Sequence, residues 1–194
     1  MVYVMLTINK LCCLSVLAVL SACGINDTKD EDSTFYAVPV GSSLTLNRTI
    51  TIPGDQVAIY LQNGEILRYK DVNKYAPNCK FEVYKISERP RTVQADTFKI
   101  IKVEDDIESS SLQNGMQYAA FGGRAGEGNA SVGLLDQSEM FNYATFMYLS
   151  SATQKDVYRM ICQHWESVMD DRHLSISQMR TAMGEVFTLK IKDY

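Results

Sequence analysis

The chain contains 194 residues, of which 19 are Lys or Arg and 23 are Asp or Glu, so its formal net charge at pH 7 is −4. This mild acidity, without any cluster of basic residues, argues against nucleic acid or an anionic membrane surface as the main partner. The length is sufficient for a short leader and one domain with a sizeable core.

The N-terminal segment, residues 1–22, has the pattern of an export signal. It contains Lys10, then the apolar run Leu11 to Leu20, and no acidic residue. About ten apolar residues are too few for the roughly 20 that a membrane-spanning helix needs. The order of a charged, an apolar and a small-residue region is typical of a secretory signal. A membrane anchor or a buried strand is the alternative, and neither accounts for the position of Cys23.

The four residues Leu20-Ser21-Ala22-Cys23 resemble the lipobox of bacterial lipoprotein signal peptides. This resemblance implies that residues 1–22 are removed and that Cys23 carries a lipid, which would anchor the protein stably to a membrane. Gly24 stands where Asp would imply retention in the inner membrane. We therefore expect a lipid-anchored protein of the cell envelope, facing the periplasm, with the outer membrane favoured over the inner membrane.

The residues after the lipobox divide into a tether and a domain. The segment 23–34 begins with Cys23 and is polar and acidic, with Ile25 as its single large apolar side chain. Such a composition buries too little surface to order a chain, so we predict a disordered tether. Residues 35–194 are predicted to form a single β-rich domain.

Cysteine usage predicts one disulfide. Cys12 and Cys13 lie in the leader and Cys23 is the lipidation site, which leaves Cys79 and Cys162. Two thiols in an oxidising compartment most often pair, while free thiols or metal ligation are the alternatives. Each cysteine lies on the more apolar face of a candidate strand, so both sulfurs are expected to point inward. The face mates are Phe81 and Val83 for Cys79, and Tyr158 and Met160 for Cys162.

The first part of the domain alternates apolar and polar residues, as half-buried strands do. We predict strands at Phe35–Val40, within 43–52, at Val57–Leu61 and at Ile66–Tyr69. Pro53-Gly54-Asp55 predicts a turn, with Gly54 free to adopt a positive φ. Asn63-Gly64 predicts a tight hairpin between the third and fourth of these strands.

The middle of the chain continues this pattern and then loses it. After a loop at Tyr75–Asn78, strands are predicted at Cys79–Val83 and at Phe98–Val103, the latter followed by an acidic turn, Glu104-Asp105-Asp106. Residues 115–133 contain six of the chain's 11 glycines, which predicts a long loop. That loop is either a plain hairpin tip or an arm that orders against a partner.

The C-terminal part contains the one predicted helix. Residues 138–149 suit a buried strand. Residues 156–165 fit either a strand or a helix capped by Thr153 and Asp156, and their composition favours the strand. Ser175 and Gln178 form a capping box for a short helix that ends at Gly184, and a final strand spans Val186–Ile191. The whole predicts a mainly β fold, an antiparallel β-sandwich or small barrel with one short C-terminal helix.

The chemistry-bearing residues are few. Met160, Cys162 and His164 would share a strand face and could bind copper, but a disulfide would consume Cys162. His173 lies near Glu166, Asp170 and Asp171 and could hold a divalent ion with them, although charged residues in a connecting loop are the commoner explanation. No nucleophile motif of the Gly-x-Ser-x-Gly type is present. We predict no metal, no cofactor and no enzymatic activity.

Two functions compete at this point. The first is a non-enzymatic module that binds another envelope protein or supports envelope structure, and the domain loosely resembles uncharacterised proteobacterial envelope lipoproteins of unknown activity. The alternative is a β-barrel carrier for a small ligand or lipid, suggested by the many Tyr, Phe and Met residues in the strands. A large apolar cavity would favour the carrier. A filled core with an exposed apolar patch would favour a protein partner.

Overall fold

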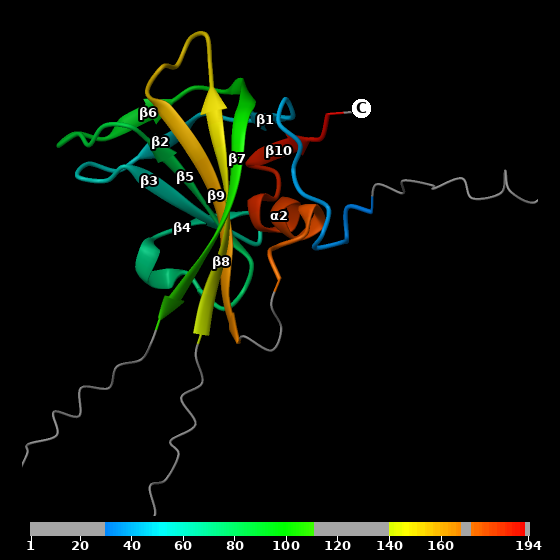
Figure 1. Ribbon diagram of the computed structural model, residues 1–194. Helices are drawn as coiled ribbons and strands as arrows, with labels where there is room; N and C mark the ends of the chain where they lie inside the picture. The colour runs from blue at the N-terminus through cyan, green and yellow to red at the C-terminus, as the bar shows by residue number, and fades with distance from the viewer. Residues whose placement is uncertain (1–29, 111–139, 168–171, 193–194) are drawn as a thin grey trace, which may run out of the picture. The chain divides into compact units, whose positions relative to one another are not determined.

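The structure is a computed structural model that describes residues 30–110, 140–167 and 172–192. The predicted mainly β fold with one short C-terminal helix is confirmed (Figure 1). Eight strands form one antiparallel sheet that curls into a half-barrel, in the order β10-β1-β7-β8-β9-β5-β3-β4, and β2 pairs with β6 separately. The strands are β1 (Ser43–Leu46), β2 (Ile50–Ile52), β3 (Ala58–Gln62), β4 (Glu65–Leu67), β5 (Asn78–Val83), β6 (Arg91–Val93), β7 (Asp96–Ser110), β8 (Met140–Ser150), β9 (Val157–Ser167) and β10 (Phe187–Lys190).

The long strands β7, β8 and β9 form the middle of the sheet. β8 pairs with β7 from Lys99 to Ser110 and with β9 over Tyr148–Met140, so it has a neighbour on both sides along nearly its whole length. β7 differs, because β1 pairs with it only over Asp96–Lys99. The far part of β7 therefore extends beyond β1.

The concave side of the half-barrel is filled with apolar side chains. The ring of Phe81 lies 5.9 Å from that of Phe98 and 5.1 Å from that of Phe187. Helix α2 (Ile176–Met183) packs over these rings and buries Met179 and Met183. Burying a side chain of this size contributes about 1.5–3 kcal/mol, so this cluster makes a large contribution to the stability of the fold.

Helix α2 begins and ends at the predicted residues. The Ser175 hydroxyl accepts a hydrogen bond from the Gln178 backbone, and the Gln178 side chain accepts one from the Ser175 N–H. At the other end Gly184 has a positive φ of 54°. A Cβ on Gly184 would lie 2.3 Å from the Cα of Gly64, so the helix end and the hairpin can meet only through two glycines. The predicted hairpin is confirmed, with φ of 52° at Asn63 and 80° at Gly64.

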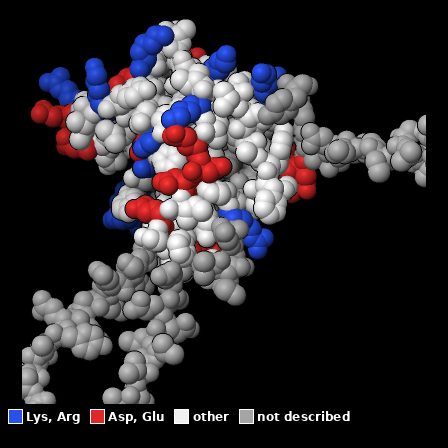
Figure 2. All heavy atoms as spheres, viewed as in Figure 1, with Lys and Arg blue, Asp and Glu red and all other residues white. Residues whose placement is uncertain are grey.

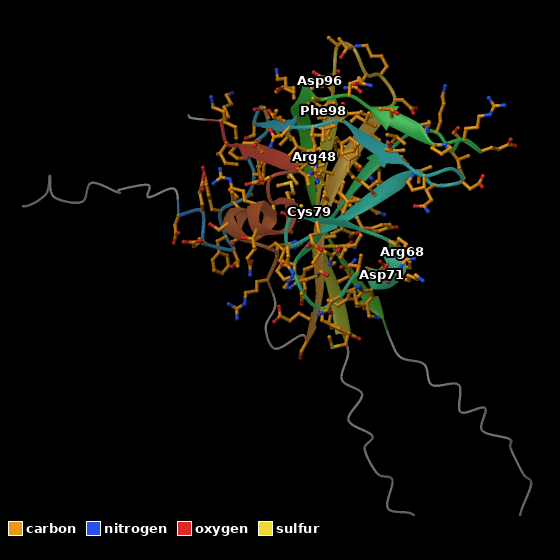
Figure 3. The ribbon with its side chains drawn as sticks, turned by 180° about the vertical axis from the view of Figure 1, so that it is seen from behind. Arg48, Arg68, Asp71, Cys79, Asp96 and Phe98 are labelled. Carbon is orange, nitrogen blue, oxygen red and sulfur yellow. A yellow bond between two sulfur atoms is a disulfide. The ribbon has the colours of Figure 1, made fainter. Side chains whose placement is uncertain are left out.

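The Cys79–Cys162 disulfide is present and joins directly opposed residues of β5 and β9. Their Cα atoms lie 4.0 Å apart and both side chains are buried. Figure 3 shows Cys79 beside α2, on the concave side of the sheet. The strand interpretation of 156–165 is thereby confirmed, but Tyr158 is not a face mate of Cys162. The β5–β9 register shifts at the start of β9, so Val157 enters the core and Tyr158 lies 4.3 Å from the ring of Tyr84 instead.

Two predicted strands are wrong or shorter than expected. Residues 35–40 form no strand: Phe35 is 95% exposed, and Pro39 has no N–H to donate to a ladder. The return strand β4 ends at Leu67, and Tyr69–Asp71 forms a 3-10 helix, η1. The Arg68 Nε and Asp71 Oδ2 atoms lie 2.6 Å apart across this turn, and Figure 3 shows both residues on the side of the sheet away from α2.

The predicted acidic turn at Glu104-Asp105-Asp106 is also wrong, because β7 passes straight through these residues. Glu104, Asp105 and Asp106 pair with Phe146, Thr145 and Ala144 of β8. The uncharged residues of β8 supply a continuous ladder, and the backbone bonds of that ladder outweigh the weak strand propensity of the acids. The turn at Pro53–Asp55 exists, but Asp55, not Gly54, has the positive φ. Gly54 is needed because a Cβ there would lie 2.4 Å from the Glu88 carbonyl oxygen.

Several predictions fall outside the described residues: the leader 1–22, Cys23, most of the tether, the glycine-rich segment 115–133, Asp170 and Asp171. The described end of the tether includes Glu31, whose carboxylate pairs with Arg180 and whose carbonyl accepts a hydrogen bond from the Ser177 N–H on α2. Within the described ranges, no helix has the length and hydropathy to cross a bilayer.

Candidate functional site

The inner face of the long strands changes from apolar to polar halfway along their length. Met147, Met160 and Cys162 are buried in the core. One or two pairs further on, the same face carries Thr145 and His164, opposite Asp105 and Tyr143 respectively. Because side chains alternate across a strand, one face of β7–β9 thus carries the core at one end and titratable groups at the other.

The rings of the two histidines both lie close to the ring of Tyr143. The centroid of the Tyr143 ring lies 6.0 Å from that of His164 and 5.7 Å from that of His173. His173 Nδ1 lies 3.8 Å from Asp105 Oδ1, and no described group gives it a hydrogen bond. Asp105 Oδ1 in turn accepts a 2.7 Å hydrogen bond from the Thr145 hydroxyl. The histidines, which the sequence places in two separate clusters, share one cluster in the fold.

His164 also holds the segment that leads into α2. Its Nε2 lies 2.9 Å from the Arg172 carbonyl oxygen, and its Nδ1 lies 3.6 Å from Glu166 Oε2. The side chain is only 9% exposed. The hydrogen bond to a backbone carbonyl gives His164 a structural role that its position on the core face already suggested.

A solvent-open cleft of about 710 Å³ runs beside this cluster. Its walls come from the β3–β4 hairpin, the loop before β5, the end of β9, the segment before α2, and α2 itself. Most of its lining side chains are polar. They include Asn63, Tyr75, His164, Glu166, Arg172, His173, Ser175, Gln178 and Thr181.

The cleft offers donors and acceptors more than catalytic groups. Met160, Cys162 and His164 share a face as predicted, but the Cys162 sulfur is bonded to Cys79 and cannot be a thiolate ligand. The Ser175 hydroxyl is engaged in the helix cap. Among the described residues there is no group of three His, Cys, Asp or Glu side chains placed to hold a metal ion. The arrangement suits recognition of a polar ligand or a polar protein segment.

The outer face of the sheet carries a second cluster, centred on Arg159. Its guanidinium lies 4.9 Å from the ring of Phe146 and 4.7 Å from the ring of Tyr158, and its Nε lies 2.5 Å from Glu82 Oε2. Burial raises the pKa of Glu82, but hydrogen bonds from Lys80 and Arg159 outweigh it, and the net shift is downward. Burial likewise lowers the pKa of Arg159, and its pairing with Glu82 more than compensates. In this cluster the Arg159–Glu82 ion pair lies against the rings of Phe146 and Tyr158 and is held by short hydrogen bonds.

A groove of about 480 Å³ separates this cluster from β7. It is lined by Phe146, Tyr148 and Arg159 on one side and by the acidic residues 104–106 on the other. Lys102 Nζ lies 2.5 Å from Glu104 Oε1. A hydrogen bond to Glu104, more than burial, raises the pKa of Tyr148. Figure 2 shows acidic side chains gathered over the middle of the long strands in this region.

Sequence reasoning missed Tyr143, Asp105 and Arg159. The alternation within 138–149 could have placed Tyr143 on one face with Met147, but only the β8–β9 register puts it opposite His164. Asp105 was assigned to a turn and therefore to no face. Arg159 had no signal, because its partner Glu82 is 77 residues away in the chain.

The comparisons with known proteins add no relative: no family model, no curated protein and no solved structure matches the chain. The clefts, the disulfide and the outer-face cluster are therefore the observations from which function is argued.

Proposed function

We propose that this protein is a lipid-anchored module of the cell envelope that binds another envelope protein without catalysing a reaction. The lipid on Cys23 would hold it at a membrane, the outer membrane in preference to the inner. The acidic segment after Cys23 would let the β-domain stand off that membrane. The lipobox pattern at residues 20–23 and the fold of the domain support the two halves of this proposal separately.

The filled interior of the half-barrel is the observation that favours a protein partner over a carried lipid. Phe81, Phe98 and Phe187 are buried in the core on the concave side, with ring centroids 5.9 and 5.1 Å apart, and Met179 and Met183 of α2 belong to the same core. In the described part of the chain, the clefts reported above are open to solvent and lined largely by polar groups. An acyl chain needs an apolar enclosure, whereas a protein segment can bind in an open polar cleft.

A small polar ligand is the second candidate. The cleft beside His164 and His173 has a volume within the usual range for small-molecule sites, about 300–1,000 Å³. The His173 imidazole, whose Nδ1 has no hydrogen-bond partner among the described residues, and the nearby Arg172 and Glu166 would orient such a ligand by hydrogen bonds.

Membrane extraction and mass spectrometry test the anchor. We expect an acylated N-terminal Cys23 in the wild type, and a Cys23→Ser variant that is released from the membrane fraction. A Cys23→Ser protein that still fractionates as a lipidated species would contradict the proposal.

Site-specific photo-crosslinking in intact cells tests the partner. A crosslinker at Thr181 in the cleft or at Glu108 on β7 should give discrete protein adducts, while one at Glu88, in the connection between β5 and β6, should not. The small-ligand function would be favoured if none of these positions gave a protein adduct and a small molecule co-purified with the wild type. That molecule should then be lost in the His173→Ala variant.

A further inference from the structure

Strand β7 has hydrogen-bonded neighbours on both of its edges only along its first third. β1 pairs with Asp96–Lys99, and the backbones of Gly41 and Ser42 hydrogen-bond to Ile100. From 101 to 109, β7 pairs with β8 on one side, and no other described segment hydrogen-bonds to its backbone on the other. Alternate N–H and C=O groups along this stretch have no partner in a second strand, which makes it a template for another strand. The Ile107 N–H donates a 3.0 Å hydrogen bond to Asp106 Oδ1.

The side chains along this open edge are acidic and regularly spaced. Lys102, Glu104, Asp106 and Glu108 share the outer face with the groove, since they lie opposite Tyr148, Phe146, Ala144 and Asn142. Residues 101–109 contain one Lys and four acids, a formal charge of −3. β8 contains no charged residue, so no cation from that strand offsets the acids. On the inner face Ile107 is 50% exposed.

The charge pattern along β7 indicates which kind of strand could pair with its open edge. A second copy of the chain would bring the same acids opposite each other, and like charges directly across a strand pair are destabilising. A strand with Lys or Arg on its outer face would place the Cβ atoms of these cationic residues about 5 Å from those of Glu104, Asp106 and Glu108, close enough for their charged groups to pair. The aliphatic stems of those cations could lie in the groove against Phe146 and Tyr148, while small apolar residues on the inner face would cover Ile107.

We propose that the open edge of β7, residues 101–109, binds an extended, lysine- or arginine-rich segment of the partner protein as an added strand of the sheet. This inference rests on the proposed function, since it names the surface that such a partner would use. Backbone hydrogen bonds would give the affinity, and the acidic row would select alternating cationic segments.

A synthetic peptide of alternating lysine and valine, long enough to lie along 102–109, tests the inference with the full chain in detergent micelles. We expect binding in a titration, and hydrogen exchange should show new protection at the amides of 101–109. The same peptide with all its backbone amides N-methylated keeps its charges but cannot form the ladder. It should bind about a hundredfold more weakly.

Two triple variants separate this edge from general acidity. Glu104→Gln with Asp106→Asn and Glu108→Gln should weaken peptide binding about tenfold or more. Asp55→Asn with Glu88→Gln and Glu185→Gln changes the net charge equally and should leave binding unchanged. The inference is overturned if the N-methylated peptide binds as well as its parent, if both triple variants lose affinity equally, or if exchange protection appears elsewhere.

A fourth result would also overturn it: absence of peptide binding to the wild type, with self-association of the Glu104, Asp106 and Glu108 variant. The acids would then serve only to keep the edge from pairing with itself. Failure of the proposed function can be told apart from failure of this inference. It would appear as absence of acylation at Cys23 or absence of all cellular crosslinks, and neither result depends on the peptide.

Discussion

The two ends of the long strands β7, β8 and β9 differ although they belong to one continuous sheet. At the end that includes Phe98, Met147 and Met160, the inner face is buried and β7 has a neighbour on each side. At the other end the inner face carries Asp105 and His164, and one edge of β7 is open. We therefore expect the packed end to contribute most of the stability, and the far end presents polar groups and an unpaired strand edge.

The largest expected effect is a difference in stability loss when one apolar residue is truncated at each end of the long strands. Phe81→Ala removes a fully buried ring that contacts two other phenylalanines, and should lower the free energy of unfolding by about 3–5 kcal/mol. Ile107→Ala at the far end should change it by less than about 0.5 kcal/mol, since that side chain is half exposed. Urea denaturation measures both.

If Phe81→Ala fails to fold, Phe81→Leu provides a milder test and should still cost more than Ile107→Ala. Equal losses from the two positions would show that the far end is as important to stability as the core, contrary to the comparison.

Loss of the disulfide should come next. Cys79 and Cys162 close a loop with a sequence separation of 83, so replacing both with Ala should cost up to about 4 kcal/mol, and less if the reduced chain retains structure. Thermal melting of the oxidised wild type against the double variant measures this. Binding of the lysine–valine peptide below the melting temperature should not change. A variant that melts normally but loses peptide binding would reverse the roles assigned to the two ends.

Gly184→Ala tests the contact between α2 and the β3–β4 hairpin, at the boundary of the cleft. The new methyl would clash with the backbone of Gly64 at a positive φ, so we expect a loss of about 2 kcal/mol. Thr181→Ala, on the exposed side of the same helix, is the matched control and should change stability by less than about 0.5 kcal/mol. Chemical denaturation of the two variants would contradict this account if their losses were the same.

The smallest effect concerns Asp96, at the packed end, whose carboxylate accepts hydrogen bonds from Ser151, Thr153 and Gln154. The bond from Ser151 contributes most to lowering its pKa, to about 2. A folded-state pKa below the unfolded value stabilises the fold at neutral pH, and this contribution disappears as the pH falls from about 4 to about 2. Solvent screening of this partly exposed group limits it to about 1 kcal/mol.

Asp96→Asn should therefore melt about 2–4 °C below the wild type at pH 7. The difference should narrow toward pH 2, as followed by circular dichroism at several pH values. Asp55→Asn serves as the control, and a gap that stays constant with pH would exclude the carboxylate charge as the cause.

Local patterns in the sequence predicted much of the packed end. The Asn63-Gly64 hairpin, the capping box at Ser175 and the pairing of Cys79 with Cys162 depend on residue types with strong, nearby physical preferences. At 156–165 a β-like composition and a position after a strand and a short polar loop favour a strand over a helix, and the structure has strand β9 there. The errors at 35–40 and 104–106 arose where a ladder partner, not the local residues, decides whether a strand forms.

By itself, the sequence determined the β class, the short C-terminal helix, the turns at Pro53–Asp55 and Asn63-Gly64, and the pairing of Cys79 with Cys162. These follow from alternation, backbone freedom and the apolar strand faces on which the two cysteines lie. Only the tertiary structure decided that His164 and His173 meet across Tyr143, that Arg159 pairs with Glu82, and that β7 extends past β1 with an open acidic edge. Each of these depends on the register of strands distant in the chain. Register is set by packing of the whole sheet, and no local pattern of residues encodes it.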